Sequence, residues 1–192
     1  MIDLKKNDFP ASLETKKLNL RILRKDDVSD IYKIYFDHES SLLDDWEPMR
    51  DISRAETLVS NSIKYFNSKE ALRYGIELKS VEKIIGVCCV WEFDDTNNKC
   101  MIYYQINRNE WNKGYTTESV GKLVWYAFEG LKVNRIEAYV TPGNKASIKV
   151  LLKNGFVNEG VMREMEYYKG KYQDGIVFGM IRKDWDTQNT KL

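Results

Sequence analysis

The sequence predicts a mixed α/β domain with a largely antiparallel sheet of about six to seven strands and about four helices. Alternating apolar and polar residues recur along most of the chain, and short polar turns separate three consecutive runs of this kind. Helical periodicity between residues 116 and 131 separates the last of these runs from one further strand-like run. Because parallel strands need a crossover connection, this segment predicts one central parallel pair.

The amino-terminal part is expected to contain one strand and two helices. Residues 18–22 alternate as a strand, and Asp26 is the expected N-cap of the first helix. Ser53 and Glu56 have the spacing of a capping box, which predicts that the second helix begins there. The expected buried stripe of this helix is Ala55, Leu58, Val59, Ile63 and Phe66.

The remaining chain alternates between strands and helices. A helix from Thr116 with Gly130 near its end follows the three strand-like runs, which should form a meander. The expected strands are residues 72–79, 83–93, 100–107, 135–141, 156–167 and 175–182, with a last helix at 145–154.

Composition describes an ordinary globular protein. The chain has 192 residues, 43% of them hydrophobic and 31% charged, so we expect one domain spanning residues 1–192. The formal charge of +1 argues against nucleic acid or membranes as partners. Three cysteines and a single histidine, His38, form neither a disulfide framework nor a two-histidine metal site, so we expect no metal. Without a signal peptide, a cytoplasmic location is expected.

Residues 111–117 read as a strand-to-helix junction that binds a phosphate group. Gly114 permits a tight turn beside a ligand, and the first amides of a helix lack internal partners. Lys113 adds a positive charge. An ordinary helix start explains the same residues. Neither a P-loop nor a dinucleotide-binding glycine motif is present, which argues against ATP and NAD.

This junction resembles the pyrophosphate-binding loop of the GNAT superfamily of N-acetyltransferases, in particular its ribosomal-protein branch. Asn112 and Thr116 replace a glycine and a small residue of the family pattern. The resemblance covers about residues 13–185 and implies the acyl-CoA N-acyltransferase fold with acetyl-CoA as cofactor. The matching residues are Trp111, Lys113, Gly114, Tyr115, Thr117 and Glu118.

A second segment, residues 144–156, resembles the same branch. The resemblance implies that Asn144 and Ser147 lie along the pantetheine arm and that Ser147 donates a proton to the departing thiolate; from the residues alone, Asn144 is a helix N-cap. Leu151 stands where many members have a tyrosine, which shifts the acid role to Ser147. Lys153 belongs to a basic stripe with Lys145 and Lys149 that is expected either to be solvated or to meet the cofactor phosphates.

The expected reaction is direct attack of a free amine on the thioester in a ternary complex. Deprotonation at pH 7 costs about 4.6 kcal/mol for a lysine side chain and only about 1.4 kcal/mol for an α-amino group. Backbone amides around Gln105 and Ile106 are expected to stabilise the developing oxyanion, as the resemblance implies. Glu92 is one candidate for the base, beside the acidic segment and a water chain.

The segment 38–48 carries four acidic residues and no lysine or arginine, which favours a cationic acceptor. The resemblance places part of the acceptor site here and implies a ribosomal-protein amino terminus, with a polyamine or an aminoglycoside as alternatives. The expected acceptor-binding residues are Asp44, Asp45, Trp46, Glu47 and Glu92.

Two other function classes compete with the enzyme. One is a coenzyme A-binding regulator without catalysis. The other is a nucleic-acid-binding module that uses the aromatic and basic residues 167–172, although a hairpin turn explains these residues as well. The protein is expected to be a monomer or a homodimer.

Overall fold

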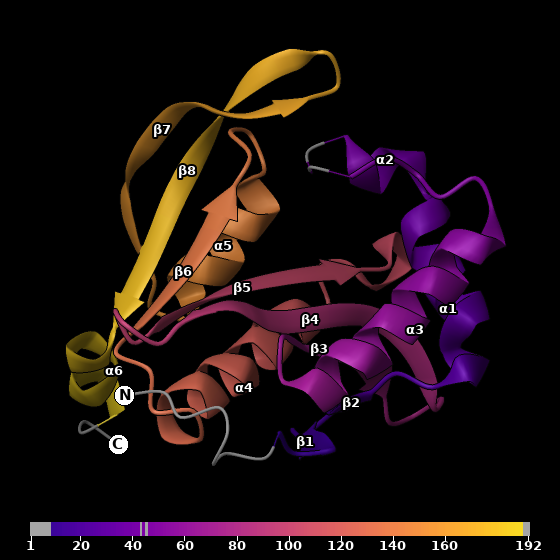
Figure 1. The fold of residues 1–192 in the computed structure, drawn as a ribbon, viewed down its shortest axis with the longest axis horizontal. Helices are drawn as coiled ribbons and strands as arrows, with labels where there is room; N and C mark the ends of the chain where they lie inside the picture. Colours follow the sequence, from indigo (N-terminus) through magenta and orange to yellow (C-terminus); the bar gives the residue numbers. More distant parts are fainter. Residues whose placement is uncertain (1–8, 43, 45, 190–192) are drawn as a thin grey trace.

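In the computed structural model, residues 9–42, 44 and 46–189 are described, and a single eight-stranded sheet forms the centre (Figure 1). The strands are β1 (Ser12–Glu14), β2 (Leu18–Ile22), β3 (Leu72–Leu78), β4 (Lys83–Asp94), β5 (Lys99–Ile106), β6 (Arg135–Val140), β7 (Val157–Tyr168) and β8 (Lys171–Ile181). Their order is β1-β2-β3-β4-β5-β6-β8-β7. Every neighbouring pair is antiparallel except β5 and β6, which are parallel, so the predicted class is confirmed.

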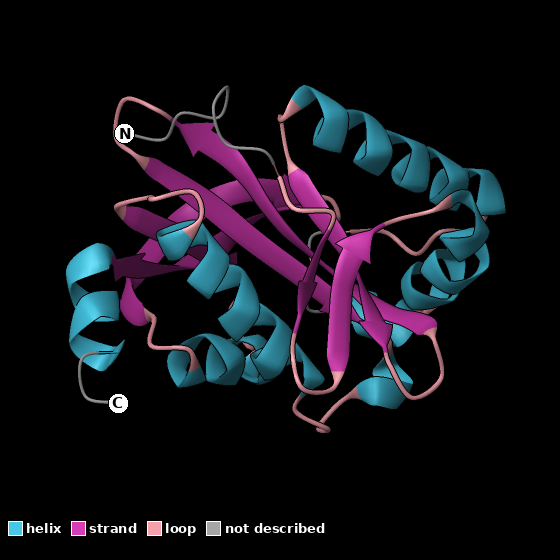
Figure 2. Cartoon of the chain, turned by 90° about the horizontal axis from the view of Figure 1, so that it is seen from below, coloured by secondary structure: helices cyan, strands magenta, loops and turns pink. Residues whose placement is uncertain are grey.

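Helices cover both faces of this sheet (Figure 2). α1 (Val28–Phe36) and α3 (Ile52–Ser68) pack together on one face, against β4 and β3. α4 (Tyr115–Glu129) packs on β4 and β5 on the other face, with α5 (Lys145–Lys153) beside it. The remaining elements are short: α2 (His38–Ser41), α6 (Arg182–Asn189) and two 3-10 turns, η1 (Lys25–Asp27) and η2 (Arg108–Glu110).

The hydrophobic core has one cluster on each face of the sheet. Tyr74, Phe128 and Phe178 are fully buried in the cluster that includes α4. The smaller cluster lies under α1 and α3. β4 is buried along most of its length, as expected of a central strand covered on both sides. Cys88 and Cys89, which are neighbours in β4, are both fully buried.

The parallel pair is short, and this creates the space for a site. β5 and β6 are paired only from Lys99↔Arg135 to Met101↔Glu137. Beyond that point β5 continues beside β4 as far as Ile106, whereas β6 continues beside β8 as far as Val140. The two strands therefore diverge, and beyond Met101 the edge of β5 that faces β6 has no neighbouring strand among the described residues.

Two predicted helix caps are wrong by one or two residues. The 3-10 turn η1 precedes α1, which begins at Val28 after Asp27 rather than after Asp26. α3 begins at Ile52, and Asp51 accepts a hydrogen bond from the Ser53 amide (2.9 Å), so Ser53 is not the cap. The Asp51 carboxylate thus accepts from the Ser53 amide, which in the predicted capping box would have donated to the Glu56 side chain.

The structure adds elements that the sequence pattern did not predict. These are β1, α2 and α6, and β8 begins at Lys171 rather than Gly175 and ends before Arg182, where α6 starts. The sheet therefore has more strands than predicted. Among the described residues, no helix is both long and apolar enough to cross a membrane.

Candidate active site

Two neighbouring cavities meet where β5 and β6 diverge. The first, named here the helix cleft, has a volume of about 430 Å³ and lies between β5, the start of α4 and α5. The second, named here the aromatic pocket, has a volume of about 360 Å³ and extends from the same point toward β3, β7 and β8. The residues that line both cavities are Asp44, Tyr104, Gln105, Asn144 and Ser147.

The start of α4 forms an open backbone cradle in the helix cleft. Gly114 is the N-cap residue and has a left-handed backbone with φ of 83°. No described atom lies within 4 Å of the position that a Cβ at Gly114 would take, so a ligand can approach this backbone closely. The amides at the start of α4 face outward without helical partners, which is the usual arrangement for binding a phosphate group.

Three lysines of α5 add positive charge to the same cleft. Lys145, Lys149 and Lys153 all line it and are exposed. None of the three forms an ion pair with a carboxylate in the described part of the chain. The basic stripe therefore belongs to the cleft, together with the cradle, and both fit a ligand with several phosphate groups.

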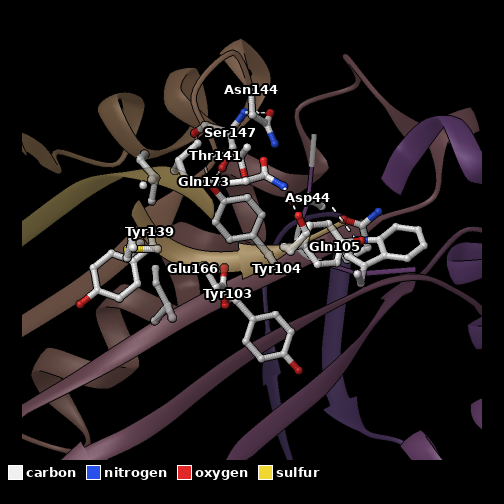
Figure 3. A pocket seen from close by; sticks show the side chains of 18 of the residues that line it. Asp44, Tyr103, Tyr104, Gln105, Tyr139, Thr141, Asn144, Ser147, Glu166 and Gln173 are labelled. Atoms are coloured by element: carbon white, nitrogen blue, oxygen red, sulfur yellow. Dashed lines mark hydrogen bonds between the residues drawn. The ribbon is translucent and has the colours of Figure 1, made fainter. Parts of the chain in front are cut away.

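Ser147 and Tyr104 form a pair of hydroxyl groups at the junction of the cavities (Figure 3). The Tyr104 Oη lies 2.8 Å from the Ser147 Oγ. Asn144 is the N-cap of α5, and its Oδ1 accepts a hydrogen bond from the Ser147 amide (3.1 Å). Burial raises the pKa of Tyr104 well above the ordinary value of tyrosine, so its hydroxyl keeps its proton at neutral pH.

The free edge of β5 supplies backbone donors to this junction. The Asn107 amide donates to Ile85 O (2.8 Å). In an alternating antiparallel ladder, the amide of Gln105 then also points toward β4, whereas the amides of Tyr104 and Ile106 point toward the gap beside β6. Of the two amides expected to stabilise an oxyanion, Ile106 is the one that faces the gap.

Aromatic rings and carboxylates line the aromatic pocket. Trp46 packs edge-on against Tyr35, with ring centroids 5.1 Å apart, and its Nε1 lies 3.4 Å from Asp44 Oδ2. Glu166 and Asp174, from β7 and β8, line the same pocket. Lys169 at the tip of the β7–β8 hairpin donates to Ser41 O of α2 (2.7 Å), so the tip of this hairpin lies beside α2 (Figure 1).

The family follows from a comparison with known proteins. Residues 17–157 match the model of the acetyltransferase (GNAT) domain. The chain belongs to the GNAT acetyltransferases. It is therefore an acetyl-CoA-dependent N-acetyltransferase.

Individual relatives agree over almost the whole chain. A Bacillus licheniformis protein named uncharacterized N-acetyltransferase p20 is 32% identical over 91% of this chain and 98% of its own length. The [ribosomal protein uS5]-alanine N-acetyltransferase of Escherichia coli K12 is 23% identical over 96% of this chain and 98% of its own length. The solved structure of the microcin C7 self immunity acetyltransferase MccE, in complex with acetyl-CoA and AMP, has the same fold, with a TM-score of 0.79 at 22% identity over 91% and 98% of the two chains.

Most cofactor-binding residues expected from the GNAT resemblance lie together in the helix cleft. Two do not line it. Lys113 pairs with Glu110 (2.9 Å), and Tyr115 lies under the ammonium of Lys17, 5.7 Å from its ring centre. The expected residues that line the cleft are Gln105, Ile106, Trp111, Asn112, Gly114, Thr116, Thr117, Asn144, Ser147 and Lys153.

Only some of the expected acceptor-binding residues line a cavity. Asp44 and Trp46 line the aromatic pocket, whereas Glu47 and Glu92 are exposed and line neither cavity. Glu92 lies at the irregularity between Trp91 and Asp94 in β4, with φ of 47°, where its side chain leaves the strand pattern. Asp45 lies outside the described residues.

Sequence reasoning missed three residues of the site. Tyr104, Glu166 and Arg73 all line the aromatic pocket, and Tyr104 also lines the helix cleft. Trp91 and Tyr103 also line this pocket, and their rings pack edge-on with centroids 6.0 Å apart.

The cysteine thiols are not part of the site. Cys88, Cys89 and Cys100 are fully buried, and none lines either cavity. Burial raises the pKa of each thiol, to about 12 for Cys89. A thiolate nucleophile is therefore not supplied from these positions at neutral pH.

Proposed function

We propose that this GNAT acetyltransferase transfers the acetyl group of acetyl-CoA to the α-amino group of a polypeptide, by direct attack with both substrates bound. The observation that carries the proposal is the meeting of the two cavities at Tyr104, Gln105 and Ser147. One cavity is lined by phosphate-binding features and the other by carboxylates and aromatic rings. Two substrates bound in them would meet at the hydroxyl pair, so no covalent intermediate on the enzyme is required.

The helix cleft has the features that acetyl-CoA requires. The backbone at Gly114, Thr116 and Thr117 would hold the pyrophosphate, and the lysines of α5 would neutralise the phosphate groups at the adenosine end. When bound, acetyl-CoA supplies the thioester whose acetyl group is transferred. The amide of Ile106 faces the gap at the junction, where it would donate to the oxygen that gains negative charge.

Ser147 is the proposed acid, and Tyr104 is its proton source. Ser147 is fixed by its place in the first turn of α5, where Asn144 caps the helix. Tyr104 keeps its proton because its pKa is raised by burial, and its hydroxyl is within hydrogen-bonding distance of Ser147 Oγ. A proton given by Ser147 to the departing thiolate would be replaced from Tyr104, and Tyr104 would in turn recover a proton from solvent.

Carboxylates of the aromatic pocket would bind the acceptor ammonium and accept its proton. Asp44 lines both cavities and Glu166 lines the pocket (Figure 3). In the view of the pocket, Glu166 lies in the same group of side chains as Tyr103 and Tyr104. An ammonium group placed between these carboxylates and the hydroxyl pair would lose its proton to a carboxylate or a water molecule held by one.

An α-amino acceptor agrees with the modest basicity of this site. No histidine lines either cavity among the described residues, so the available bases are carboxylates. An α-amino group needs only about 1.4 kcal/mol for deprotonation at pH 7, about 3 kcal/mol less than a lysine side chain. The relative from Escherichia coli named for a ribosomal-protein alanine supports an amino-terminal acceptor of the ribosomal type.

The test is release of the coenzyme A thiol over a panel of amines. The panel contains amino-terminal peptides of ribosomal proteins, lysine side-chain peptides, spermidine and an aminoglycoside. The proposal expects the highest kcat/KM for an amino-terminal peptide, with the acetyl group located on the α-nitrogen by mass spectrometry. Faster turnover of a polyamine or an aminoglycoside would overturn the acceptor class, and tight coenzyme A binding without turnover of any amine would indicate a regulator.

A further inference from the structure

Arg73 of β3 places a cationic guanidinium on the wall of the aromatic pocket, opposite in charge to the carboxylates there. Its Nε donates to the Tyr103 hydroxyl, and its Nη1 donates to Ser62 Oγ at 3.0 Å. The guanidinium carbon also lies 5.5 Å from the centre of the Tyr103 ring. These two partners and the Cys89 thiol, which also interacts with the guanidinium, are neutral, and an arginine has five N–H donors, so donors remain for a ligand.

Other arginines of this chain that are at least half-buried are paired with carboxylates. Arg21 binds Asp27 and Glu77. The remaining two examples follow the same pattern: Arg135 with Glu137 and Glu159, and Arg182 with Glu129 and Asp186. Among the described residues, Arg73 has no carboxylate within ion-pair distance. A half-buried arginine without a counter-ion is unfavourable in free energy, because its charge is partly removed from water. An anion bound in the adjoining pocket would compensate for this loss of hydration.

Trp91 contributes an aromatic ring to the same wall as Arg73. Its Nε1 is buried and has no hydrogen-bond partner among the described residues. Trp91 lines the same pocket, and its ring packs edge-on against Tyr103, the residue that binds Arg73. The strand register places Trp91, Arg73 and Tyr103 on the same face of the sheet. Because Trp91 Nε1 is fully buried, the donors on this wall that call for a ligand with acceptor oxygens are the remaining N–H groups of Arg73.

We propose that Arg73 binds a carboxylate of the acceptor, so that the preferred substrate of the proposed reaction is a primary amine that also carries a nearby carboxylate. The inference rests on the proposed function and narrows its substrate. The ammonium would lie between Asp44 and Glu166 at the junction, and the carboxylate would lie at the opposite wall, on the guanidinium. A planar guanidinium fits a carboxylate with two parallel hydrogen bonds, which a neutral amide cannot match in charge.

Two kinds of acceptor carry an amine with a nearby carboxylate, and the experiment distinguishes between them. One is an acidic side chain close to the amino terminus of a peptide, and the other is the α-carboxylate of a free amino acid. The probes are peptides that carry Asp or Asn at the first or second position, and free amino acids compared with their amides. The measured quantity is the ratio of kcat/KM for the acid and its amide. Because both rates come from one enzyme preparation, a loss of folded protein cancels.

For the wild-type enzyme, kcat/KM is expected to be about tenfold to 100-fold higher for the acid than for its amide, either in the peptide series or in the amino-acid series. In Arg73→Gln the ratio should fall to about one, mainly through KM, and Arg73→Lys should keep part of the preference. Arg163→Gln is the matched control, because Arg163 is exposed on β7, lines neither cavity, and should leave the ratio unchanged.

A ratio near one in the wild type, or an unchanged ratio in a folded Arg73→Gln enzyme, would overturn the inference. This outcome is distinguishable from a failure of the proposed function. Turnover of neutral acceptors would still show acetyl transfer, even if the enzyme has no preference for an acidic acceptor. If no amine gives thiol release, the proposed function fails. Calorimetric binding of the acidic and amide probes, with wild type and Arg73→Gln, then decides whether Arg73 binds a carboxylate.

Discussion

The Tyr104 hydroxyl lies 2.8 Å from the Ser147 hydroxyl and joins the divergent edge of β5 to the first turn of α5. The two residues are far apart in sequence, and they meet only because β6 turns away from β5. Leu151, where many GNAT members have a tyrosine, is completely buried in this chain. A hydroxyl from the sheet therefore lies beside Ser147, where the family often uses one from the helix.

The effects of Ser147→Ala and Tyr104→Phe on kcat should not be additive. If Ser147 gives a proton to the thiolate and Tyr104 replaces it, Ser147→Ala should lower kcat by about tenfold to 100-fold with little change in coenzyme A affinity. Tyr104→Phe should have a smaller effect, and the double variant should be no slower than Ser147→Ala alone. Single-turnover rates and calorimetric dissociation constants measure both quantities. Additive losses in the double variant would show that the two hydroxyls act separately.

Gly114→Val should weaken coenzyme A binding by at least about tenfold and leave the fold intact. The left-handed backbone at Gly114 disfavours a β-branched residue, and the open space above it is where the phosphates are expected. Gly170→Val is a matched control, since Gly170 has φ of 78°, equally free space and a place outside both cavities. We expect the two variants to lose Tm to a similar extent, and only Gly114→Val to lose affinity for coenzyme A. Equal affinities would place the phosphates elsewhere.

The lysine stripe of α5 should contribute to coenzyme A affinity in a salt-dependent way. Exposed charges contribute about 0.2–1 kcal/mol each, so Lys149→Gln should weaken binding by about 1.4-fold to fivefold at low salt and by less at high salt. Lys183→Gln is the control, because Lys183 is exposed on α6 and lines neither cavity. Dissociation constants at two salt concentrations measure the effect. A Lys149→Gln enzyme with wild-type affinity at low salt would indicate that the stripe is only solvated surface.

The pH profile should rise toward alkaline pH without a falling limb from Tyr104. The acceptor α-amino group deprotonates near pH 8, so kcat/KM increases up to that range. Burial raises the pKa of Tyr104, which means that its protonated form persists to higher pH than an ordinary tyrosine near pH 10. Rates with an amino-terminal peptide between pH 6 and 10 test this. A falling limb below pH 9 that disappears in Tyr104→Phe would show that Tyr104 loses its proton too early for the proposed role.

Much of the fold could be predicted because its signals are local. The alternation in residues 72–107 and the helical period after Thr116 fixed the meander, the crossover and the parallel pair. α2 and α6 were missed because α2 is a single turn and because Trp185 is the only apolar residue in α6. Trp185 stacks on Phe128 with centroids 5.4 Å apart, a tertiary contact that no local pattern carries.

The site was predictable only where its residues are close in sequence. The cradle from Trp111 to Thr117 and the turn from Asn144 to Ser147 lie within short segments with recognisable spacing. Tyr104 occupies an ordinary strand position, and its role depends on where β6 diverges. Glu166 and Arg73 come from β7 and β3, on opposite sides of β5 in the sheet, so their shared pocket is a property of the assembled topology.

The most direct test of the account is the initial rate of thiol release with acetyl-CoA and an amino-terminal peptide varied independently. Direct transfer between two substrates that meet at Tyr104 and Ser147 requires both to be bound together. Double-reciprocal plots should therefore intersect, and no acetylated enzyme should form when the peptide is omitted. Parallel plots, together with an acetylated residue on the enzyme in the absence of the amine, would show a covalent intermediate and contradict the account.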